Sequence, residues 1–303
     1  MRFLNLRLQN FRNIEFTELP LGNSRIFLLG ANGQGKSNLL EALGLATALR
    51  SFRTQTLAAL PRKGGKEYKL AYELEHDTQG LTTLEIHSHA KGRSVWVDGE
   101  KVSRLVEFIG RFPSVTLCSS DLMLLRGSPS ERRRFMDLTL SVVNRDYYTA
   151  IRDLHRGIAG RNRLLKNNGS AAELSAFEAE IAPHASQIAN YREVGMRSLS
   201  EVLCRTYDRI AEADEGPELS FRPNVDCHDT EAYCRLLYES RKRDRMIGAT
   251  QRGPHRDDFN FSLQVGGARE YASDGQQRGL CLALQIAQAS FYRQQLGLVP
   301  VLL

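Results

Sequence analysis

The chain has 303 residues, of which 42% are hydrophobic and 25% charged, which is the usage of a folded globular protein and excludes disordered, collagen-like and disulfide-scaffold chains. This length suits roughly two domains, and the net charge of +6 modestly favours an acidic partner such as nucleic acid. Charges interrupt the N-terminal segment and no apolar run approaches about 18 residues, so we expect neither secretion nor a membrane span.

The first elements are predicted from alternating polar and apolar residues. Residues 3–8 and 14–16 follow this pattern, which predicts two half-buried strands. The apolar run over residues 25–29 predicts a strand buried on both faces. A glycine-rich loop follows, and apolar residues at helical spacing over 39–46 predict a helix that packs along the sheet.

The middle of the first half shows the period of two again. Residues 68–102 alternate in this way, which predicts the strands of an antiparallel meander. Asp98-Gly99 predicts a tight hairpin, because both residue types tolerate a positive φ. Further on, Ser128 and Glu131 have the spacing that suits the start of a helix.

Residues 131–240 are mainly helical in pattern and predict an inserted arm. The polar residues 167–170 predict the loop between two antiparallel helices. Pro183 is expected to break or kink the second of them, because proline lacks the N–H donor and clashes with the preceding turn. Residues 229–246 are again helical in pattern.

The C-terminal part returns to strand and helix. Alternation over 259–265 predicts a strand, and a helix is expected to start near Ser273. We therefore divide the chain into an N-terminal part of a head domain (1–130), a helical arm (131–240) and a C-terminal part of the head (241–303).

A phosphate-binding motif lies between the predicted strand over 25–29 and the following helix. It matches G-x-x-x-x-G-K-[ST] in full, with a strand before it and a helix after it. Glycines let backbone amides turn toward phosphate oxygens, Lys36 can reach the β- and γ-phosphates, and Ser37 can bind Mg²⁺. The predicted nucleotide-binding residues are Gly30, Ala31, Asn32, Gly33, Gln34, Gly35, Lys36, Ser37 and Asn38. ATP and Mg²⁺ are the predicted cofactors.

Several motifs in order resemble one family. Asn10-Phe11-Arg12, the loop with its continuation Asn38-Leu39-Leu40-Glu41-Ala42, Arg50–Thr54, Arg126–Asp137 and Gly248–Asp258 resemble the RecF proteins of the SMC and RecF group. The resemblance covers essentially the whole chain. It implies an α/β fold with an ABC-ATPase-like head, in which a mixed sheet with an antiparallel meander surrounds the P-loop, plus an inserted helical arm. It also implies that Arg12 belongs to the nucleotide site.

A second motif, Ser273-Asp274-Gly275-Gln276-Gln277-Arg278, lies at the predicted helix start. Free backbone amides at a helix N-terminus form an anion site, although an ordinary serine N-cap has the same sequence. In the family that the chain resembles, this signature motif caps the γ-phosphate of ATP held by the opposite subunit. We therefore assign Ser273, Gly275 and Gln276 to a site completed by a partner copy.

The sequence departs from the family pattern at several places. Ser119 and Ser120 replace a usual proline and glutamate, and Asp274 replaces a usual glutamine near a site suited to anions. The apolar run at 298–303 predicts the beginning of a buried strand. The family continues this strand into paired acidic residues that hold Mg²⁺ and activate water, so we expect a longer reading frame, and weak nucleotide binding without family-type hydrolysis from this chain.

Basic residues gather at the entrance to the arm and along it. The predicted DNA contacts are Arg132, Arg133, Arg134, Arg161 and Arg163, with the alternative that these arginines form a solvated helical face. Arg241-Lys242-Arg243 and Arg245 form a second basic cluster, interpreted as surface. Asp257 and Asp258 offer adjacent carboxylates, but neighbouring residues of a strand point to opposite faces, so a structural role competes with a metal-binding one.

The cysteines bear on localisation and metal binding. Cys118, Cys204, Cys227, Cys234 and Cys281 are odd in number and scattered, without a CxxC pair. This pattern is typical of reduced thiols in the cytoplasm and argues against a zinc site.

The predicted function is that of a RecF-like protein of recombinational repair and replication restart. The resemblance implies ATP-driven head dimerisation on double-stranded or gapped DNA, a weak DNA-dependent ATPase activity in the full-length family, and recombination mediators as partners that help to load recombinase. Two alternatives stay open: a monomeric P-loop NTPase switch or kinase module, and a DNA-binding protein whose nucleotide site does not hydrolyse.

Overall fold

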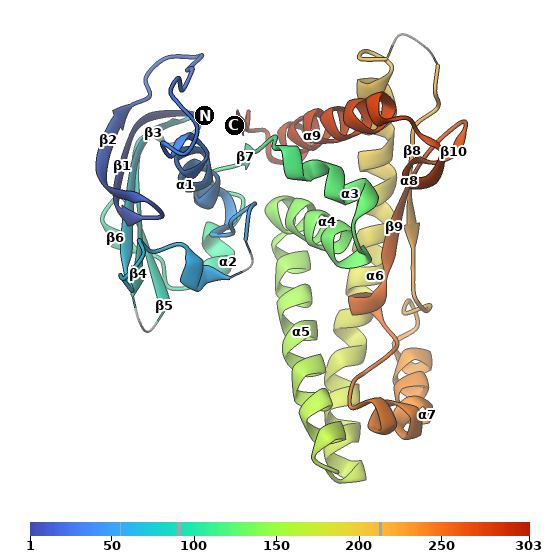
Figure 1. Ribbon diagram of the computed structural model, residues 1–303. Coiled ribbons are helices and arrows are strands. Elements are labelled where there is room, and N and C mark those ends of the chain that lie inside the picture. Colours follow the sequence, from blue (N-terminus) through green and yellow to red (C-terminus); the bar gives the residue numbers. More distant parts are fainter. Residues whose placement is uncertain (55, 90–91, 212–213) are drawn as a thin grey trace. The chain divides into compact units, whose positions relative to one another are not determined.

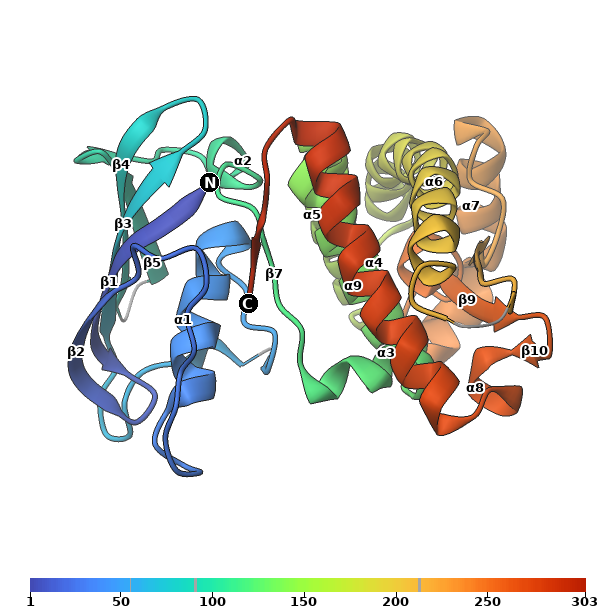
Figure 2. The same cartoon turned by 90° about the horizontal axis from the view of Figure 1, so that it is seen from above.

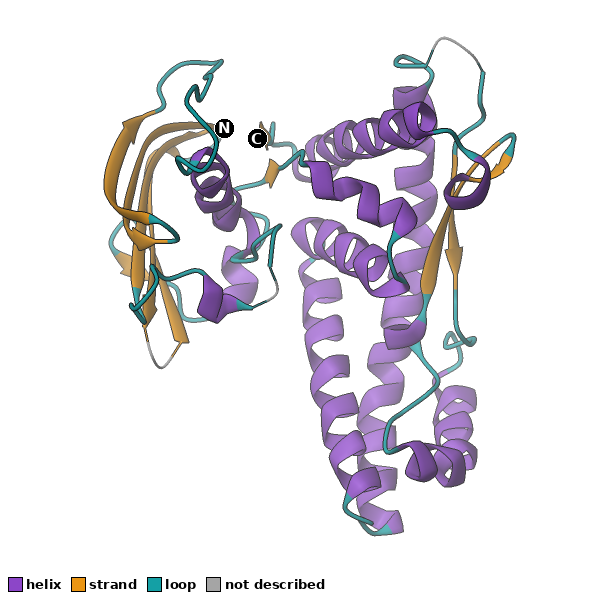
Figure 3. Ribbon diagram, in the orientation of Figure 1, coloured by secondary structure: helices purple, strands orange, loops and turns teal. Residues whose placement is uncertain are grey.

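The chain folds into two compact units. The structure, a computed structural model, describes residues 1–54, 56–89, 92–211 and 214–303. One unit comprises Met1–Ser120 with Tyr292–Leu303, and the other comprises Asp121–Phe291. The first contains most of the strands and the second most of the helices (Figure 3). Residues 241–291 therefore belong to the same unit as the helical arm, whereas the sequence analysis assigned them to the C-terminal part of the head domain.

The first unit is built on an antiparallel sheet. Its strands among the described residues follow the order β2-β1-β3-β4-β5-β6, which confirms the predicted N-terminal strands and the meander. The Asp98-Gly99 turn has φ values of 51° and 80° and joins β5 to β6 through the pair Val97 and Glu100, as the hairpin signal predicted. The bounds are β1 Arg2–Phe11, β2 Ile14–Pro20, β3 Tyr68–His76, β4 Gly80–His89, β5 Gly92–Val97 and β6 Glu100–Lys101.

One face of this sheet is covered by helix α1 (Lys36–Ala48) (Figures 1 and 2). Leu6, Leu70 and Leu84 point from neighbouring strands into the shared core and are completely buried. The Tyr72 hydroxyl on β3 donates a hydrogen bond of 2.6 Å to the Ala42 carbonyl of α1. The alternating pattern of the strands thus fixes the face against which the phosphate-loop helix rests.

The predicted strand over residues 25–29 is wrong. These residues have no regular secondary structure, and Phe27 and Leu29 are 81% and 90% exposed. A strand buried on both faces needs hydrogen-bonded neighbours, and in the described part of the chain no strand pairs with this segment. An apolar run alone therefore did not suffice to form a strand here.

Short elements complete the first unit. Parallel pairing joins β7 to β11, with Ser114 opposite Val301, which confirms that a strand begins in the last apolar run. Thr47 of α1 and Ser114 share a buried hydrogen bond of 2.6 Å between their hydroxyls, so this small sheet is also tied to α1. The bounds are η1 Leu57–Ala59, α2 Leu105–Phe108, β7 Ser114–Val115 and β11 Val301–Leu302.

The second unit combines helices with a small antiparallel sheet of order β10-β9-β8. The sequence predicted β9 but not β8, which pairs with it from Glu218 opposite Ser262 to Arg222 opposite Asp258. The bounds are α3 Met123–Arg126, α4 Pro129–Val143, α5 Arg145–Lys166, α6 Ala171–Tyr207, β8 Glu218–Arg222, α7 Thr230–Ile247, η3 Pro254–Arg256, β9 Asp258–Leu263, β10 Gly266–Gly267 and α8 Ala268–Tyr271. The chain passes between the two units within η2 Ser119–Leu122 and α9 Asp274–Leu296.

Helices α5 and α6 form the long antiparallel hairpin of the arm, and α7 packs beside it (Figure 1). Ser170 and Glu173 form a reciprocal capping box that starts α6 after the predicted loop. A Cβ atom at Gly160 would lie only 2.2 Å from the Phe177 ring, so glycine allows the close approach of the two helices. Helix α6 continues through Pro183, although the sequence analysis predicted that this proline would break or kink the helix. Among the described residues, no helix combines the length and apolar character needed to cross a membrane.

Candidate nucleotide-binding site

The predicted phosphate loop leads directly into α1. Gly33 and Gly35 have φ values of +83° and +102°, which residues with a Cβ rarely adopt. Gly35 is the N-cap, no side chain of the described residues caps the helix, and its first turn holds no acidic residue. Backbone amides and the positive end of the helix dipole therefore face solvent at this point, which is the arrangement that binds phosphate.

Lys36 and Ser37 supply the polar side chains of the loop. The Lys36 ammonium folds back and donates hydrogen bonds to the Gly30 carbonyl and, at 2.7 Å, to the Ala31 carbonyl. These acceptors are neutral, so a phosphate oxygen would bind the ammonium more strongly. Ser37 is exposed in the first turn of α1. The donors present fit the phosphates of ATP, and the Ser37 hydroxyl would contribute to a Mg²⁺ site.

Arg12 lies behind the loop and does not point into it. Its Nε and Nη2 atoms donate to the two carboxylate oxygens of Glu41 at 2.8 and 2.6 Å, and Nη1 donates to the Ala59 carbonyl at 2.7 Å. Glu41 is completely buried on α1. Arg12 thus fixes α1 against the turn that follows β1, and direct contact between Arg12 and nucleotide stays a prediction.

The Arg50–Thr54 motif meets the same carboxylate. The Ser51 hydroxyl donates to Glu41, and an Arg53 nitrogen lies 3.5 Å from it. Arg53 also donates to the Asn38 side-chain oxygen at 2.5 Å. The Asn10-Phe11-Arg12 motif, the Arg50–Thr54 motif and the continuation of the phosphate loop are separate in sequence. Their side chains meet at the first two turns of α1, which explains why the three motifs occur together in one chain.

Asn13 is a residue of the site that the sequence analysis missed. Its Nδ2 donates to the Gly33 carbonyl at 3.2 Å, and its Oδ1 accepts from Asn38 at 2.7 Å. A Cβ atom at Gly35 would lie 3.1 Å from the same Oδ1. Asn13 therefore supports the phosphate loop from the turn after β1. Only its position beside the Asn10-Phe11-Arg12 motif could have indicated this role.

Replacing Glu41 by glutamine should weaken the support of α1. The amide keeps one acceptor but loses the charge that pairs with Arg12 and Arg53, so we expect a loss of about 1–2 kcal/mol in the free energy of unfolding. Urea unfolding followed by circular dichroism measures it. Glu15→Gln is the control, because Glu15 pairs with Arg62 but is 72% exposed. Equal effects of the two substitutions would contradict the role of Glu41.

The signature residues lie at the start of α9 in the second unit. Ser273 Oγ accepts from the Gln276 amide at 3.2 Å, and Gln276 Oε1 accepts from the Ser273 amide at 2.8 Å, which is a capping box. Gln276 also donates to Glu215 at 3.0 Å. Among the described residues, a Cβ atom at Gly275 would have only the Ser273 hydroxyl within 4 Å, at 3.9 Å. The turn is open at Ser273 and Gly275, whereas the Gln276 amide is engaged within its own chain.

Arg126 neutralises the unusual Asp274. Its guanidinium forms an ion pair with the Asp274 carboxylate and donates to the Gln277 side chain. Asp274 is 79% exposed in the first helical turn, where a carboxylate interacts favourably with the helix dipole. The carboxylate that departs from the family pattern at position 274 is therefore balanced by the Arg126 guanidinium of α3. Ser119 and Ser120 lie in the short helix η2.

Two of the predicted DNA contacts, Arg161 and Arg132, are buried in the structure. Arg161 is completely buried, and its guanidinium bonds to Glu178, Asp244 and Thr250 at 2.7–3.0 Å. Arg132 is 7% exposed and forms a bidentate pair with Asp258 at 2.7 and 3.0 Å. Both guanidinium groups hold the second unit together and are not available to phosphates.

The other predicted DNA contacts differ in exposure. Arg133 is half-buried and donates to the Asp257 carbonyl at 2.6 Å. Arg134 is also half-buried, whereas Arg163 on α5 is exposed. Of the predicted set, Arg163 is therefore the residue most accessible to a nucleic-acid backbone.

Comparison with known proteins decides the family. A family model described as an AAA domain matches residues 5–170. The DNA replication and repair protein RecF of Moorella thermoacetica is 34% identical over 98% of this chain and 80% of its own length. The chain belongs to the RecF family. RecF of Leptospira interrogans (serovar Lai) is 32% identical over 99% of the chain and 82% of its own length.

Solved RecF structures agree with the fold. The recombination mediator protein RecF-ATP in the RecFOR pathway superposes with a TM-score of 0.89 at 25% identity, covering 99% of this chain and 83% of that one. RecF-ATPrS gives 0.87 at the same identity. These matches confirm the α/β, ABC-ATPase-like fold and the RecF resemblance. They support for this chain a role in DNA replication and repair.

In the acidic pair of the RecF-like stretch over 248–258, both carboxylates are bonded to arginines. Asp257, which directly precedes β9, accepts from Arg192 at 2.6 Å, and Asp258, the first residue of β9, accepts from Arg132, so each carboxylate has its own arginine partner. No group of three or more potential ligands that could hold a metal ion occurs among the residues that the structure describes.

The buried His255 in the same stretch predicts that the stability of the fold depends on pH. Burial lowers the pKa of His255 to about 4, and its Nδ1 has no hydrogen-bond partner among the residues that the structure describes. In the unfolded chain the pKa is about 6.5, so between these values the unfolded state binds more protons and the fold loses stability as pH falls. Because of His255, we expect the free energy of unfolding to fall by about 1 kcal/mol between pH 7 and pH 5.5.

Urea unfolding of the parent and of His255→Gln at these two pH values measures that contribution. Glutamine can still donate to the Thr250 carbonyl, which His255 Nε2 approaches at 3.0 Å. The pH dependence of the variant should therefore be smaller by this amount. His89→Gln is the control, because His89 is exposed. An unchanged pH dependence in His255→Gln would show that the buried imidazole does not contribute.

Proposed function

We propose that this chain is an ATP-dependent DNA-binding protein of recombinational repair and replication restart. The observation that carries the proposal is the uncapped N-terminus of α1 behind a complete phosphate loop, with Lys36 and Ser37 beside it. The RecF relatives add the biological setting, because they are named for DNA replication and repair. ATP with Mg²⁺ is the ligand proposed for this loop.

ATP is proposed to join two copies of the chain. The turn is open at Ser273 and Gly275 at the start of α9, and the N-terminus of this helix suits the γ-phosphate of a nucleotide held by a partner copy. A ligand that binds only the dimer shifts the population toward it. The closed dimer would hold double-stranded or gapped DNA, with Arg163 among the phosphate contacts, and act with recombination mediators that load recombinase.

The test is the solution mass from light scattering, with and without ATP and Mg²⁺. We expect the mass to double when nucleotide is added and to stay monomeric in Ser273→Arg, because arginine at this turn blocks a facing nucleotide. Ser103→Arg is the control, since Ser103 is an exposed residue of the first unit. Nucleotide binding without a change of mass would reject the dimer and favour a monomeric NTPase.

A further inference from the structure

The outer end of the arm carries a basic cluster that the nucleotide site does not use. In the segment Arg241-Lys242-Arg243-Asp244-Arg245 at the end of α7, the single acidic residue is buried and pairs with Arg161 at 2.7 Å. Lys242, Arg243 and Arg245 are exposed, and in the described ranges none of the three forms an ion pair. Within residues 241–246, the exposed charged side chains are therefore all positive.

Helix α5 extends the same positive surface. The Lys166 side chain lies beside Gly248, because a Cβ atom there would be 3.3 Å from Lys166 Cγ. Arg245 donates to the Gly169 carbonyl at 2.8 Å, so the end of α7 is fastened to the loop between α5 and α6. Glu173, the acidic residue nearest in sequence to this loop, has its carboxylate bonded within the capping box. The cations of two elements thus share one end of the arm.

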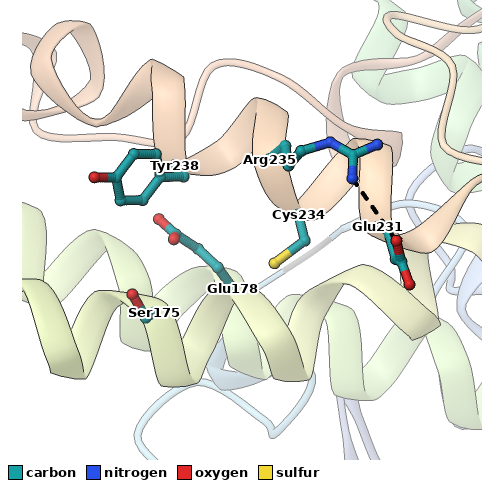
Figure 4. A pocket seen from close by; sticks show the side chains of 6 residues that line it. All are labelled: Ser175, Glu178, Glu231, Cys234, Arg235 and Tyr238. Carbon is teal, nitrogen blue, oxygen red and sulfur yellow. Dashed lines mark ion pairs between the residues drawn. The ribbon is translucent and has the colours of Figure 1, made fainter.

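A pocket between α6 and α7 adjoins these cations. It is lined by Ser175, Glu178, Glu231, Cys234, Arg235 and Tyr238. In Figure 4, Cys234 and Tyr238 of α7 lie opposite Ser175 and Glu178 of α6. The exposed Tyr238 ring lies 4.4 Å from the Arg241 guanidinium, which in turn bonds to the buried Glu178 at 2.5 Å. Arg241 therefore holds the pocket wall in place.

Helical spacing aligns the pocket with the cations. Cys234, Tyr238, Lys242 and Arg245 follow one another at intervals of four, four and three residues, so they share one face of α7. Met246 is four residues after Lys242 and is 76% exposed. We call this face, from Cys234 to Met246 together with Lys166, the arm-end surface. It combines an aromatic-walled pocket with exposed cations and an exposed thioether.

We propose that the arm-end surface docks an acidic segment of a partner protein that inserts an apolar side chain beside Tyr238. Charge complementarity selects the acidic partner, since Lys242, Arg243 and Arg245 are exposed and form no ion pair among the described residues. Tyr, Met and Arg are the residue types enriched in protein interfaces. Contacts to a nucleic-acid backbone need cations and polar donors but no apolar pocket, so a protein fits this surface better. This docking is independent of the proposed nucleotide site.

The first experiment selects partners without assuming a sequence. A display library of random 12-residue peptides is panned against the full chain, and recovered peptides are measured by fluorescence anisotropy. We expect enrichment of Asp and Glu together with one aromatic or aliphatic residue. Affinity should fall about tenfold or more in Lys242→Glu/Arg245→Glu and about fivefold in Tyr238→Ser. Peptides without acidic enrichment, or equally bound by the double variant, would overturn the proposal.

Two controls test whether the loss of peptide affinity is specific to the arm-end surface, and whether this surface binds protein or DNA. Arg197→Glu reverses a charge on α6 whose side chain is 72% exposed, and it should leave peptide affinity unchanged. A labelled 20-base-pair duplex is measured with every variant, and its affinity should not follow that of the peptides. If the double variant loses as much duplex affinity as peptide affinity, the surface belongs to nucleic acid and the proposal fails. Thermal unfolding verifies that Tyr238→Ser and the double variant are folded.

Discussion

Replacing Arg192 by methionine is expected to lower the free energy of unfolding by about 3–5 kcal/mol. Arg192 is completely buried and donates to Asp137, Asp257 and the Pro254 carbonyl at 2.6–2.8 Å. Methionine fills similar volume but leaves two carboxylates without their cation. This buried arginine joins α4, α6 and the segment before β9, so its loss affects the whole second unit.

Urea unfolding followed by circular dichroism measures this effect, with Arg197→Met on the same helix as the exposed control. Burial already raises the pKa of Asp257, and removal of Arg192 takes away a charge that lowers it. An acidic group whose pKa is higher in the folded than in the unfolded state destabilises the fold at pH values above its unfolded pKa. It no longer does so at pH values below that pKa. The loss in Arg192→Met should therefore be larger at pH 7 than at pH 4. A loss below about 1 kcal/mol at pH 7 would contradict the prediction.

Replacing Lys36 by methionine is expected to weaken ATP binding about 100-fold. The ammonium is the cation of the phosphate loop, and losing a charged hydrogen-bond partner costs about 1.5–3 kcal/mol per bond. Isothermal titration with ATP and Mg²⁺ measures the affinity. The stability of the fold should change little, because among the described residues Lys36 bonds only to two backbone carbonyls, both in the loop itself.

Lys63→Met provides the matched control for the loop. Lys63 is exposed in the same unit, and its replacement removes the same charge without touching the phosphate loop. Its ATP affinity should stay close to that of the parent. If Lys36→Met bound ATP within about threefold of the parent, the ammonium would not be a phosphate ligand and the proposed nucleotide site would have to be abandoned.

Local signals predicted a large part of this structure correctly. The hairpin at Asp98-Gly99 and the helix after Gly35 follow from residues adjacent in sequence, whose φ preferences and periodicity do not depend on distant partners. The same holds for the glycines of the phosphate loop, because only residues without a Cβ turn readily in this way. These features were accessible from the sequence alone.

Features that depend on distant partners were not accessible. Residues 25–29 have the composition of a central strand, but a strand forms only where neighbours pair with it. Arg161 looks like any other arginine of a basic helix, yet it meets Asp244, 83 residues away. Strand β8 exists because β9 pairs with it. Burial of charge and pairing of strands are properties of the tertiary fold, which composition and periodicity do not contain.

Helix α6 has a mechanical consequence for the second unit. Its 37 residues make a rod about 55 Å long at 1.5 Å per residue. At one end, Tyr207 bonds to Glu215, which accepts from Gln276 in the signature turn. At the other end, Ser170 and Glu173 adjoin the arm-end surface. A stiff rod acts as a lever, so a tilt of one degree at the signature turn would displace the far end by about 1 Å.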